Sequence, residues 1–159
     1  MLLKKAGAFL ARRAYSRYDL REKLSGIAGD VEIESALERL EQLNLLNDAD
    51  YAYNFALHRI RQQGWSPTKV QNALLRHRVG MPVIECALER VQNEVGDQTS
   101  IILEYVQTRS GKKGLPSDQK GIRRLILHLR QRGFDDENIL GALRRIIPAA
   151  ALQPFETGD

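Results

Sequence analysis

One five-residue motif occurs three times in the chain, as ALERL at residues 36–40, ALERV at 87–91 and ALRRI at 142–146. The copies start 51 and then 55 residues apart, and each is preceded by a turn and, before the turn, by a leucine. A repeat of this length is typical of proteins that stack one small structural unit. We therefore expect three related units rather than one irregular domain.

Each unit has the sequence pattern of α-helices. Apolar residues recur at spacings of three and four, as at Ile122, Leu125 and Ile126, and no sustained alternation predicts a strand. Ser66 followed by Pro67 is a typical helix start, because the serine oxygen caps a free N–H group and proline lacks one. We predict nine helices, at residues 3–13, 17–25, 31–43, 48–62, 67–78, 82–94, 98–109, 118–131 and 136–147.

The predicted fold class is all-α, with three tandem three-helix repeats forming an elongated, curved array. Three short helices bury little surface alone, so neighbouring repeats should pack against one another. The expected boundaries are 1–46 for repeat 1, 47–95 for repeat 2 and 96–148 for repeat 3, which carries a long basic loop. Residues 149–159 are expected to form a flexible tail.

The composition fits a globular cytoplasmic protein. The chain has 159 residues, of which 43% are hydrophobic and 28% charged, and neither value favours disorder. The single cysteine, Cys86, cannot form an internal disulfide. There is no run of about 18 apolar residues that could span a membrane. Because no apolar stripe is left over beyond those the repeats use, we expect a monomer.

Positive charge is concentrated in two stretches. No acidic residue lies between Asp50 and Glu85, and Asp118 is the only one between Arg109 and Arg132. Basic stretches of this kind favour a polyanion or an acidic protein surface as partner, although solvated helix faces explain them equally simply. Our candidates for binding such a partner, chosen from their charge, are Arg59, Arg61, Lys69, Arg76, Arg78, Lys112, Lys113, Arg123, Arg124, Arg130 and Arg132.

The sequence contains no recognisable catalytic or metal-binding constellation, so we expect no enzyme activity, no metal and no cofactor. The histidines, His58, His77 and His128, stand apart without an acidic or histidine neighbour at helical spacing. Cys86 takes the place of Ser35 and Gly141 in the other repeats, and we interpret this position as a tight packing site with a buried cysteine.

Trp65 allows two interpretations. It is the only tryptophan and has basic residues on both sides, which suits an anchor at a protein interface. It also precedes Ser66 as Tyr15 precedes Ser16, which favours an apolar side chain packed over the start of a helix.

Several segments in order resemble the RecX regulatory proteins. They are ARRAYS at 11–16, DLREKL at 19–24, LNLLND at 43–48 and LRQRGF at 129–134. Together they extend the resemblance over residues 6 to 147. Asn47 departs from the pattern, since an acidic residue is common at that place.

The resemblance implies a bacterial protein that modulates the RecA recombinase. RecX proteins lie along the groove of the RecA–DNA filament and inhibit its ATPase, strand-exchange and coprotease activities as well as filament growth. The implied partners are therefore the RecA filament and, through weak contacts, single- or double-stranded DNA. The resemblance carries no catalytic residue to this chain.

Two other functions compete with this one. A three-helix unit with a basic helix can act as a helix-turn-helix protein that binds DNA directly, but the basic residues do not gather on one recognition helix. A structural adaptor for an unrelated acidic partner is the third class.

Overall fold

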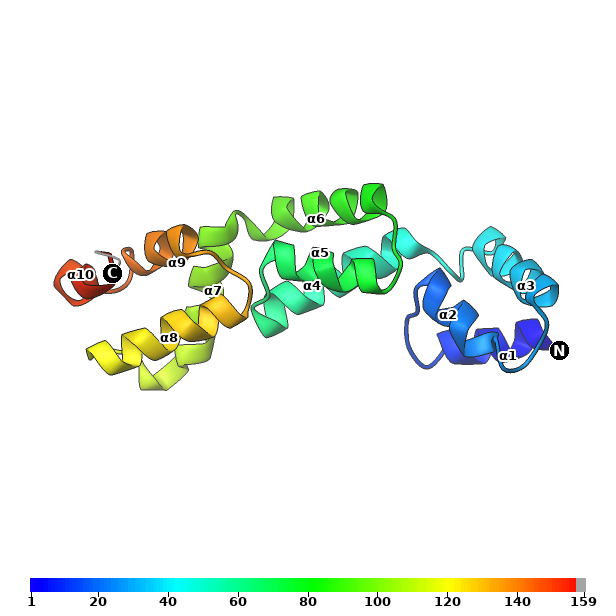
Figure 1. The fold of residues 1–159 in the computed structure, drawn as a ribbon, viewed down its shortest axis with the longest axis horizontal. Coiled ribbons are helices and arrows are strands. Elements are labelled where there is room, and N and C mark those ends of the chain that lie inside the picture. The colour runs from blue at the N-terminus through cyan, green and yellow to red at the C-terminus, as the bar shows by residue number, and fades with distance from the viewer. Residues whose placement is uncertain (157–159) are drawn as a thin grey trace. The chain divides into compact units, whose positions relative to one another are not determined.

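The computed structural model describes residues 1–156, which contain helices and no strand (Figure 1). The all-α prediction is confirmed. The α-helices are α1 (Leu2–Leu10), α2 (Arg17–Leu24), α3 (Asp30–Gln42), α4 (Asp48–Gln63), α5 (Pro67–Arg76), α6 (Met81–Val95), α7 (Gln98–Ser110), α8 (Gln119–Gln131), α9 (Asp136–Leu143) and α10 (Ala149–Glu156), with a short 3-10 helix, η1 (Gly111–Lys113), after α7.

Two of the nine expected helices, the first and the last, end three or more residues earlier than predicted. The helix α9 ends at Leu143 instead of residue 147, because Ile147 precedes Pro148 and a residue before proline avoids helical backbone angles. The last turn tightens instead, with the N–H of Ile146 donating to the carbonyl of Leu143 at 3.0 Å. The helix α1 ends at Leu10, after which the N–H of Arg12 donates to the carbonyl of Phe9 at 3.1 Å.

The expected flexible tail contains a tenth helix, so this prediction is wrong for residues 149–156, while 157–159 lie outside the described residues. Leu152 of α10 is fully buried, and Nε of Arg144 lies 2.7 Å from Oε1 of Glu156. Pro154 lies inside α10, and because proline has no backbone N–H it cannot donate to the carbonyl of residue 150 as other helical residues do.

The residues form two compact units. Unit 1 comprises residues 1–55 and 71–90, and unit 2 comprises residues 56–70 and the chain from Val91 onward. The boundary passes within α4, α5 and α6, so these units differ from the three sequence repeats. The repeat boundaries at 46, 95 and 148 therefore stay a prediction.

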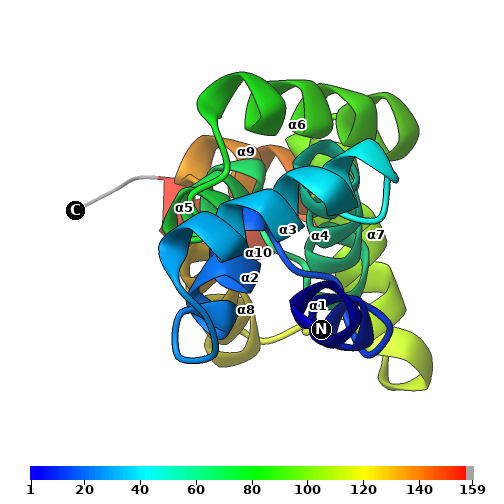
Figure 2. The same ribbon diagram turned by 90° about the vertical axis from the view of Figure 1, so that its right-hand side faces the viewer.

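Unit 1 has an apolar core built by α1, α2 and α3 (Figures 1 and 2). The helices α1 and α2 both pack against α3. The stripes that the sequence pattern predicts supply most of the buried residues, and burying leucine-sized side chains is the main stabilising contribution to such a small core. Its members are Ala6, Tyr15, Leu20, Leu24, Ile33, Leu37, Leu40 and Leu46.

The start of α2 contacts the end of α5 inside unit 1, and we call this contact the first junction. Ser16 is fully buried and caps α2, since its Oγ accepts from the N–H of Asp19 at 3.1 Å. The same hydroxyl donates to the carbonyl of His77 at 2.9 Å. Nδ1 of His77 in turn lies 2.8 Å from Oδ2 of Asp19. One serine thus starts its own helix and receives the end of another.

The start of α5 contacts the end of α8 inside unit 2, and we call this contact the second junction. Ser66, also fully buried, caps α5 by accepting from the N–H of Lys69 at 3.1 Å. Here the backbone N–H of Ser66 donates to the carbonyl of Arg132 at 2.9 Å, and Nζ of Lys69 donates to that of Gln131 at 2.7 Å. The equivalence of Ser16 and Ser66 in the sequence therefore corresponds to an equivalent place in the fold.

The third helix of this series, α8, starts differently. Asp118 is its N-cap, and Oδ1 of Asp118 accepts from the N–H of Gly121 at 3.2 Å. Asp118 is exposed, whereas Ser16 and Ser66 are buried. The remainder of unit 2 is built mainly by α7 and α8 packed against α9.

The expected packing role of Cys86 is wrong. Its side chain is exposed on α6, and a Cβ placed on the equivalent Gly141 would meet no atom within 4 Å. The position accepts serine, cysteine and glycine because it faces solvent, and not because space is short.

Candidate nucleic-acid and protein interface

Most of the predicted binding residues present their charge to solvent. In unit 1, Arg76 and Arg78 are exposed, and the guanidinium carbon of Arg78 lies 5.8 Å from the ring centre of Tyr18. In unit 2 the exposed members are Arg61, Lys112, Lys113, Arg123, Arg124 and Arg130. Four of them, Lys112, Lys113, Arg123 and Arg124, come from η1 and the first part of α8.

Two of the predicted residues flank Trp65 and have structural contacts inside unit 2. The guanidinium carbon of Arg59 lies 4.7 Å from the ring centre of Trp65, and Nζ of Lys69 lies 4.8 Å from it. Cations at this distance are attracted to the electron-rich face of the indole. Arg59 also donates to Oε1 of Gln63 at 2.6 Å, and Lys69 belongs to the second junction. Both side chains are therefore engaged at this place within unit 2.

Arg130 has a carboxylate partner. Its Nε and one terminal nitrogen donate to the two carboxylate oxygens of Asp136, at 2.6 and 2.8 Å. These hydrogen bonds from Arg130 hold the pKa of Asp136 below its usual value. The pairing occupies the guanidinium edge that could otherwise take up a phosphate or a carboxylate of a partner.

A polar hollow of about 450 Å³ lies in unit 2, and we call it the arginine hollow. Two of its residues, Arg61 and Arg132, are among the predicted candidates, and the structure adds Arg109. Residues from the end of α4, from α7 and from the end of α8 line it. They are Arg61, Gln62, Gln63, Tyr105, Thr108, Arg109 and Arg132.

The wall of the hollow is fixed by Tyr105. Its hydroxyl lies 2.9 Å from Nε2 of His128, and the two rings are nearly parallel, with 4° between their planes. Gly64, with φ of +62°, ends α4 against the Tyr105 ring, and a Cβ there would come within 2.5 Å of it. Glycine is needed at this position for both its backbone angle and its size.

The pKa of His128 is affected by the positive charges near this wall. Burial lowers the pKa of His128, and the charges of Arg109 and Arg132 lower it further. Arg109 and Arg132 line the same hollow as Tyr105, whose hydroxyl contacts His128.

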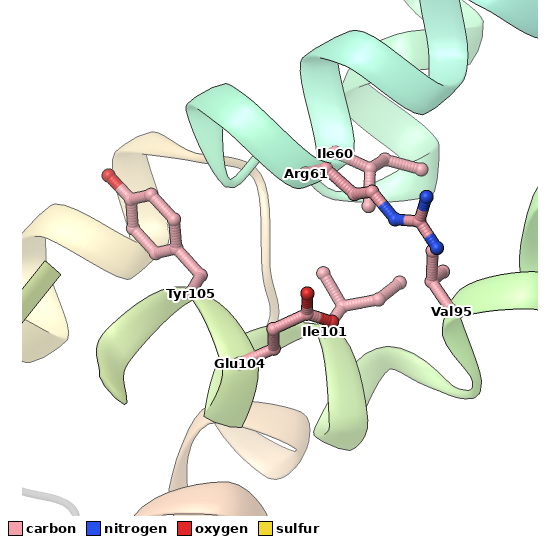
Figure 3. Close-up of a pocket in the computed structure, with 6 residues that line it drawn as sticks. All are labelled: Ile60, Arg61, Val95, Ile101, Glu104 and Tyr105. Atoms are coloured by element: carbon pink, nitrogen blue, oxygen red, sulfur yellow. The ribbon is translucent and has the colours of Figure 1, made fainter. Parts of the chain in front are cut away.

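The guanidinium group of Arg61 extends toward Val95 (Figure 3) and toward Glu94. Figure 3 shows its side chain extending from α4 toward Val95, while Tyr105 on α7 points away from it. A terminal nitrogen of Arg61 lies 3.7 Å from a carboxylate oxygen of Glu94. The apolar pocket between them, which Ile60 and Ile101 also line, holds only about 10 Å³, roughly the space of one water molecule. This pocket is too small for a ligand.

The three histidines do not form a shared site. His77 contacts Asp19 and the Tyr51 and Phe55 rings in unit 1, His128 contacts Tyr105 in unit 2, and His58 is exposed. Within residues 1–156, no three His, Cys, Asp or Glu side chains are grouped to hold a metal ion. None of the helices in this part of the chain combines the length and hydropathy needed to cross a bilayer.

Comparison with known proteins identifies the family to which this chain is similar. The model of the RecX second three-helix domain matches residues 47–88. The regulatory protein RecX of Prosthecochloris aestuarii is 32% identical over 148 residues, which cover 91% of this chain and 93% of that protein. The chain belongs to the RecX family. The resemblance found in the sequence is confirmed.

Other RecX proteins match over different lengths. The regulatory protein RecX of one Thermus thermophilus strain is 41% identical over 85 residues, so the match spans only 58% of that protein's length. The crystal structure of RecX from Lactobacillus salivarius superimposes with a TM-score of 0.71 at 17% identity, covering 91% of this chain and 94% of that one. The helical repeat fold of the family is therefore also the fold of this chain.

One arginine of the hollow, Arg109, was missed in the sequence for a physical reason. Arg109 belongs to the basic stretch that ends at Arg132, but 23 positions separate the two in the chain. Only the packing of α7 and α8 with α9 brings them to one hollow. The sequence contains one indication of this position, which is that the predicted helix 98–109 ends at Arg109.

Proposed function

We propose that the chain is a negative regulator of the RecA recombinase. It binds in the groove of the RecA–DNA filament, inhibits the ATPase, strand-exchange and coprotease activities, and limits filament growth. The observation that carries this proposal is the match to a protein named regulatory protein RecX over nine-tenths of both chains. The chain acts here by binding and not as an enzyme, and the partner implies a cytoplasmic location.

The exposed basic residues support binding to a polyanionic filament. Lys112 and Lys113 follow α7, and Arg123 and Arg124 lie in the first two turns of α8. Charges of this kind speed association and position a partner while the buried core keeps the fold. They are the residues of the predicted set that we assign to filament contact.

The decisive measurement is the rate of ATP hydrolysis by the cognate RecA on single-stranded DNA, with this chain titrated in. We expect the rate to fall at concentrations well below that of RecA, because one bound molecule affects several subunits. An unchanged rate at every order of addition would contradict the proposal. Tight, salt-sensitive binding to naked duplex DNA would then favour direct DNA binding.

A matched pair of variants locates the contact. Replacing Lys112, Lys113, Arg123 and Arg124 together with alanine should shift the inhibition curve to higher concentration by about tenfold or more, since each lost charge removes a modest favourable contribution. The control replaces four exposed basic residues of unit 1, namely Lys4, Lys5, Arg12 and Arg39. Equal losses in both variants would show that only the net charge matters.

A further inference from the structure

The arginine hollow gathers hydrogen-bond donors from three separate helices. Arg109 comes from α7, Arg132 follows the end of α8, and Gln62 and Gln63 end α4, with the hydroxyl of Thr108 beside them. None of the described side chains that line this hollow is acidic. Glu94 pairs with Arg61, and Glu104 lines the neighbouring small pocket instead.

Two like charges placed beside one aromatic pair repel each other. Arg109 and Arg132 line the hollow together with Tyr105, which contacts His128, and after burial their charges are the further cause of the lowered pKa of His128. Holding positive charges together without an anion is unfavourable, and a bound anion would relieve it. The hollow is therefore electrostatically prepared for a negatively charged group.

The same unit shows how this chain binds a carboxylate. Arg130 alone satisfies both oxygens of Asp136 with two parallel hydrogen bonds. A carboxylate is planar and has two oxygens, so one guanidinium is enough. The hollow instead has a volume of about 450 Å³ and is lined by donors from three different helices and their ends. That arrangement fits a tetrahedral group with oxygens on several sides.

We propose that the arginine hollow is a binding site for a phosphate group of a nucleic-acid backbone. Arg109 and Arg132 are its charged ligands, and the amide and hydroxyl side chains of Gln62, Gln63 and Thr108 are neutral donors. Tyr105, which contacts His128, forms part of the wall beside the two arginines. The assignment rests on the proposed function in one respect only, which is that DNA is part of the partner.

The test measures the binding of the full chain to a fluorescently labelled, short single-stranded oligonucleotide by anisotropy, without RecA. Arg109→Ala and Arg132→Ala should each weaken binding by about tenfold, the usual effect of losing a charge-assisted hydrogen bond. Each should also reduce the slope of log affinity against log salt by about one. Arg39→Ala, which removes an exposed arginine of unit 1, should leave both quantities unchanged.

Two further measurements keep the test independent of folding. An oligonucleotide with neutral methylphosphonate linkages should bind weakly, and with the same affinity, to the wild-type chain and to both arginine variants. Titration with inorganic phosphate should raise the pKa of His128 in the wild type, since an anion beside the imidazole stabilises its charged form. Nuclear magnetic resonance resolves that shift, and His128→Gln identifies the signal.

Several outcomes would overturn the site. One is oligonucleotide binding in Arg109→Ala and Arg132→Ala that equals the wild type, and another is no binding in the wild type. Weakened binding to polyglutamate with unchanged oligonucleotide binding would assign the hollow to protein carboxylates instead. Inhibition of RecA by the same preparations separates the two proposals. If the chain inhibits RecA but the arginine variants bind DNA like the wild type, only the phosphate site is contradicted. If the chain binds DNA through the hollow but does not inhibit RecA, only the proposed function is contradicted.

Discussion

The two junctions use the same design with different chemistry. In the first junction the side-chain hydroxyl of Ser16 donates to the carbonyl of His77. In the second junction the backbone N–H of Ser66 donates to the carbonyl of Arg132, and the hydroxyl serves only the cap. Both satisfy carbonyl groups that the end of an α-helix leaves without a partner. In both junctions a carbonyl group at a helix end therefore accepts a hydrogen bond, but the donor is a side-chain hydroxyl in the first and a backbone N–H in the second.

The backbone beyond each accepting helix differs as well. Arg78 follows the first junction with φ of 55°, and Gly133 follows the second with φ of 93°. A Cβ at Gly133 would lie 2.5 Å from Oγ of Ser66, so the second junction has no room for a side chain. The exposed Arg78 lies instead over Tyr18. The second junction is thus the tighter of the two.

The largest expected effect comes from the glycine of the tighter junction. Gly133→Ala should lower the free energy of unfolding by about 3 kcal/mol, because a strained backbone angle adds to an overlap with Ser66. Urea unfolding followed by the fluorescence of Trp65, the only tryptophan, reports on unit 2 directly.

The matching change in the looser junction is Arg78→Gly. It should alter the free energy of unfolding by less than about 1 kcal/mol, because relief of backbone strain offsets the lost contact with Tyr18. Equal effects at the two positions would show that the junctions do not differ in tightness.

The serines should separate the two donors. Ser16→Ala removes both a helix cap and a hydrogen bond to His77 and should cost about 2 kcal/mol. Ser66→Ala should cost about 1 kcal/mol, because alanine keeps the N–H that binds Arg132. Urea unfolding followed by circular dichroism gives both values, and a larger loss for Ser66→Ala would reverse the proposed roles.

Lys69 offers a smaller effect in the second junction. Lys69→Met keeps an apolar stem beside Trp65 but loses the hydrogen bond to Gln131, and it should cost about 0.5 kcal/mol. The same fluorescence measurement checks this value. No change would mean that Nζ of Lys69 gains nothing over its contacts with water.

The smallest effect concerns pH and distinguishes the units. The folded-state pKa of His128 is lowered, so the unfolded chain binds more protons and stability in unit 2 rises with pH. That stability should fall as the pH drops below about 6.5, the usual histidine value. His128→Gln should make the Trp65-detected unfolding less dependent on pH in this range, and an unchanged profile would contradict the assigned cause.

Local structure could be predicted from the sequence where short-range physics decides it. Ser66 followed by Pro67 marks the start of α5, and both residues stand at the predicted place. Leu20 and Leu24 belong to the core because helical spacing sets their face. Ile27, although in register with them, is exposed because α2 ends at Leu24.

Features that depend on tertiary packing could not be predicted. Comparison of repeats gave Cys86 a buried place, but Cys86 and Ser35 are exposed, and a Cβ at Gly141 would meet no atom within 4 Å. The helix α10 was not predicted, because Pro148 and Pro154 disfavour a helix in this segment. Its buried residue Leu152 also belongs to no periodic apolar pattern. Arg109 and Arg132 meet only through the packing of α7, α8 and α9.

Asp118 has a consequence for the start of α8. A serine hydroxyl donates and accepts together, whereas an ionised carboxylate only accepts. The end of a helix presents carbonyl oxygens with partial negative charge. Asp118 caps α8 as Ser16 caps α2, but its side chain cannot donate to a helix end as Ser16 donates to the carbonyl of His77. The start of α8 therefore carries an exposed negative charge where the starts of α2 and α5 carry a buried, neutral hydroxyl.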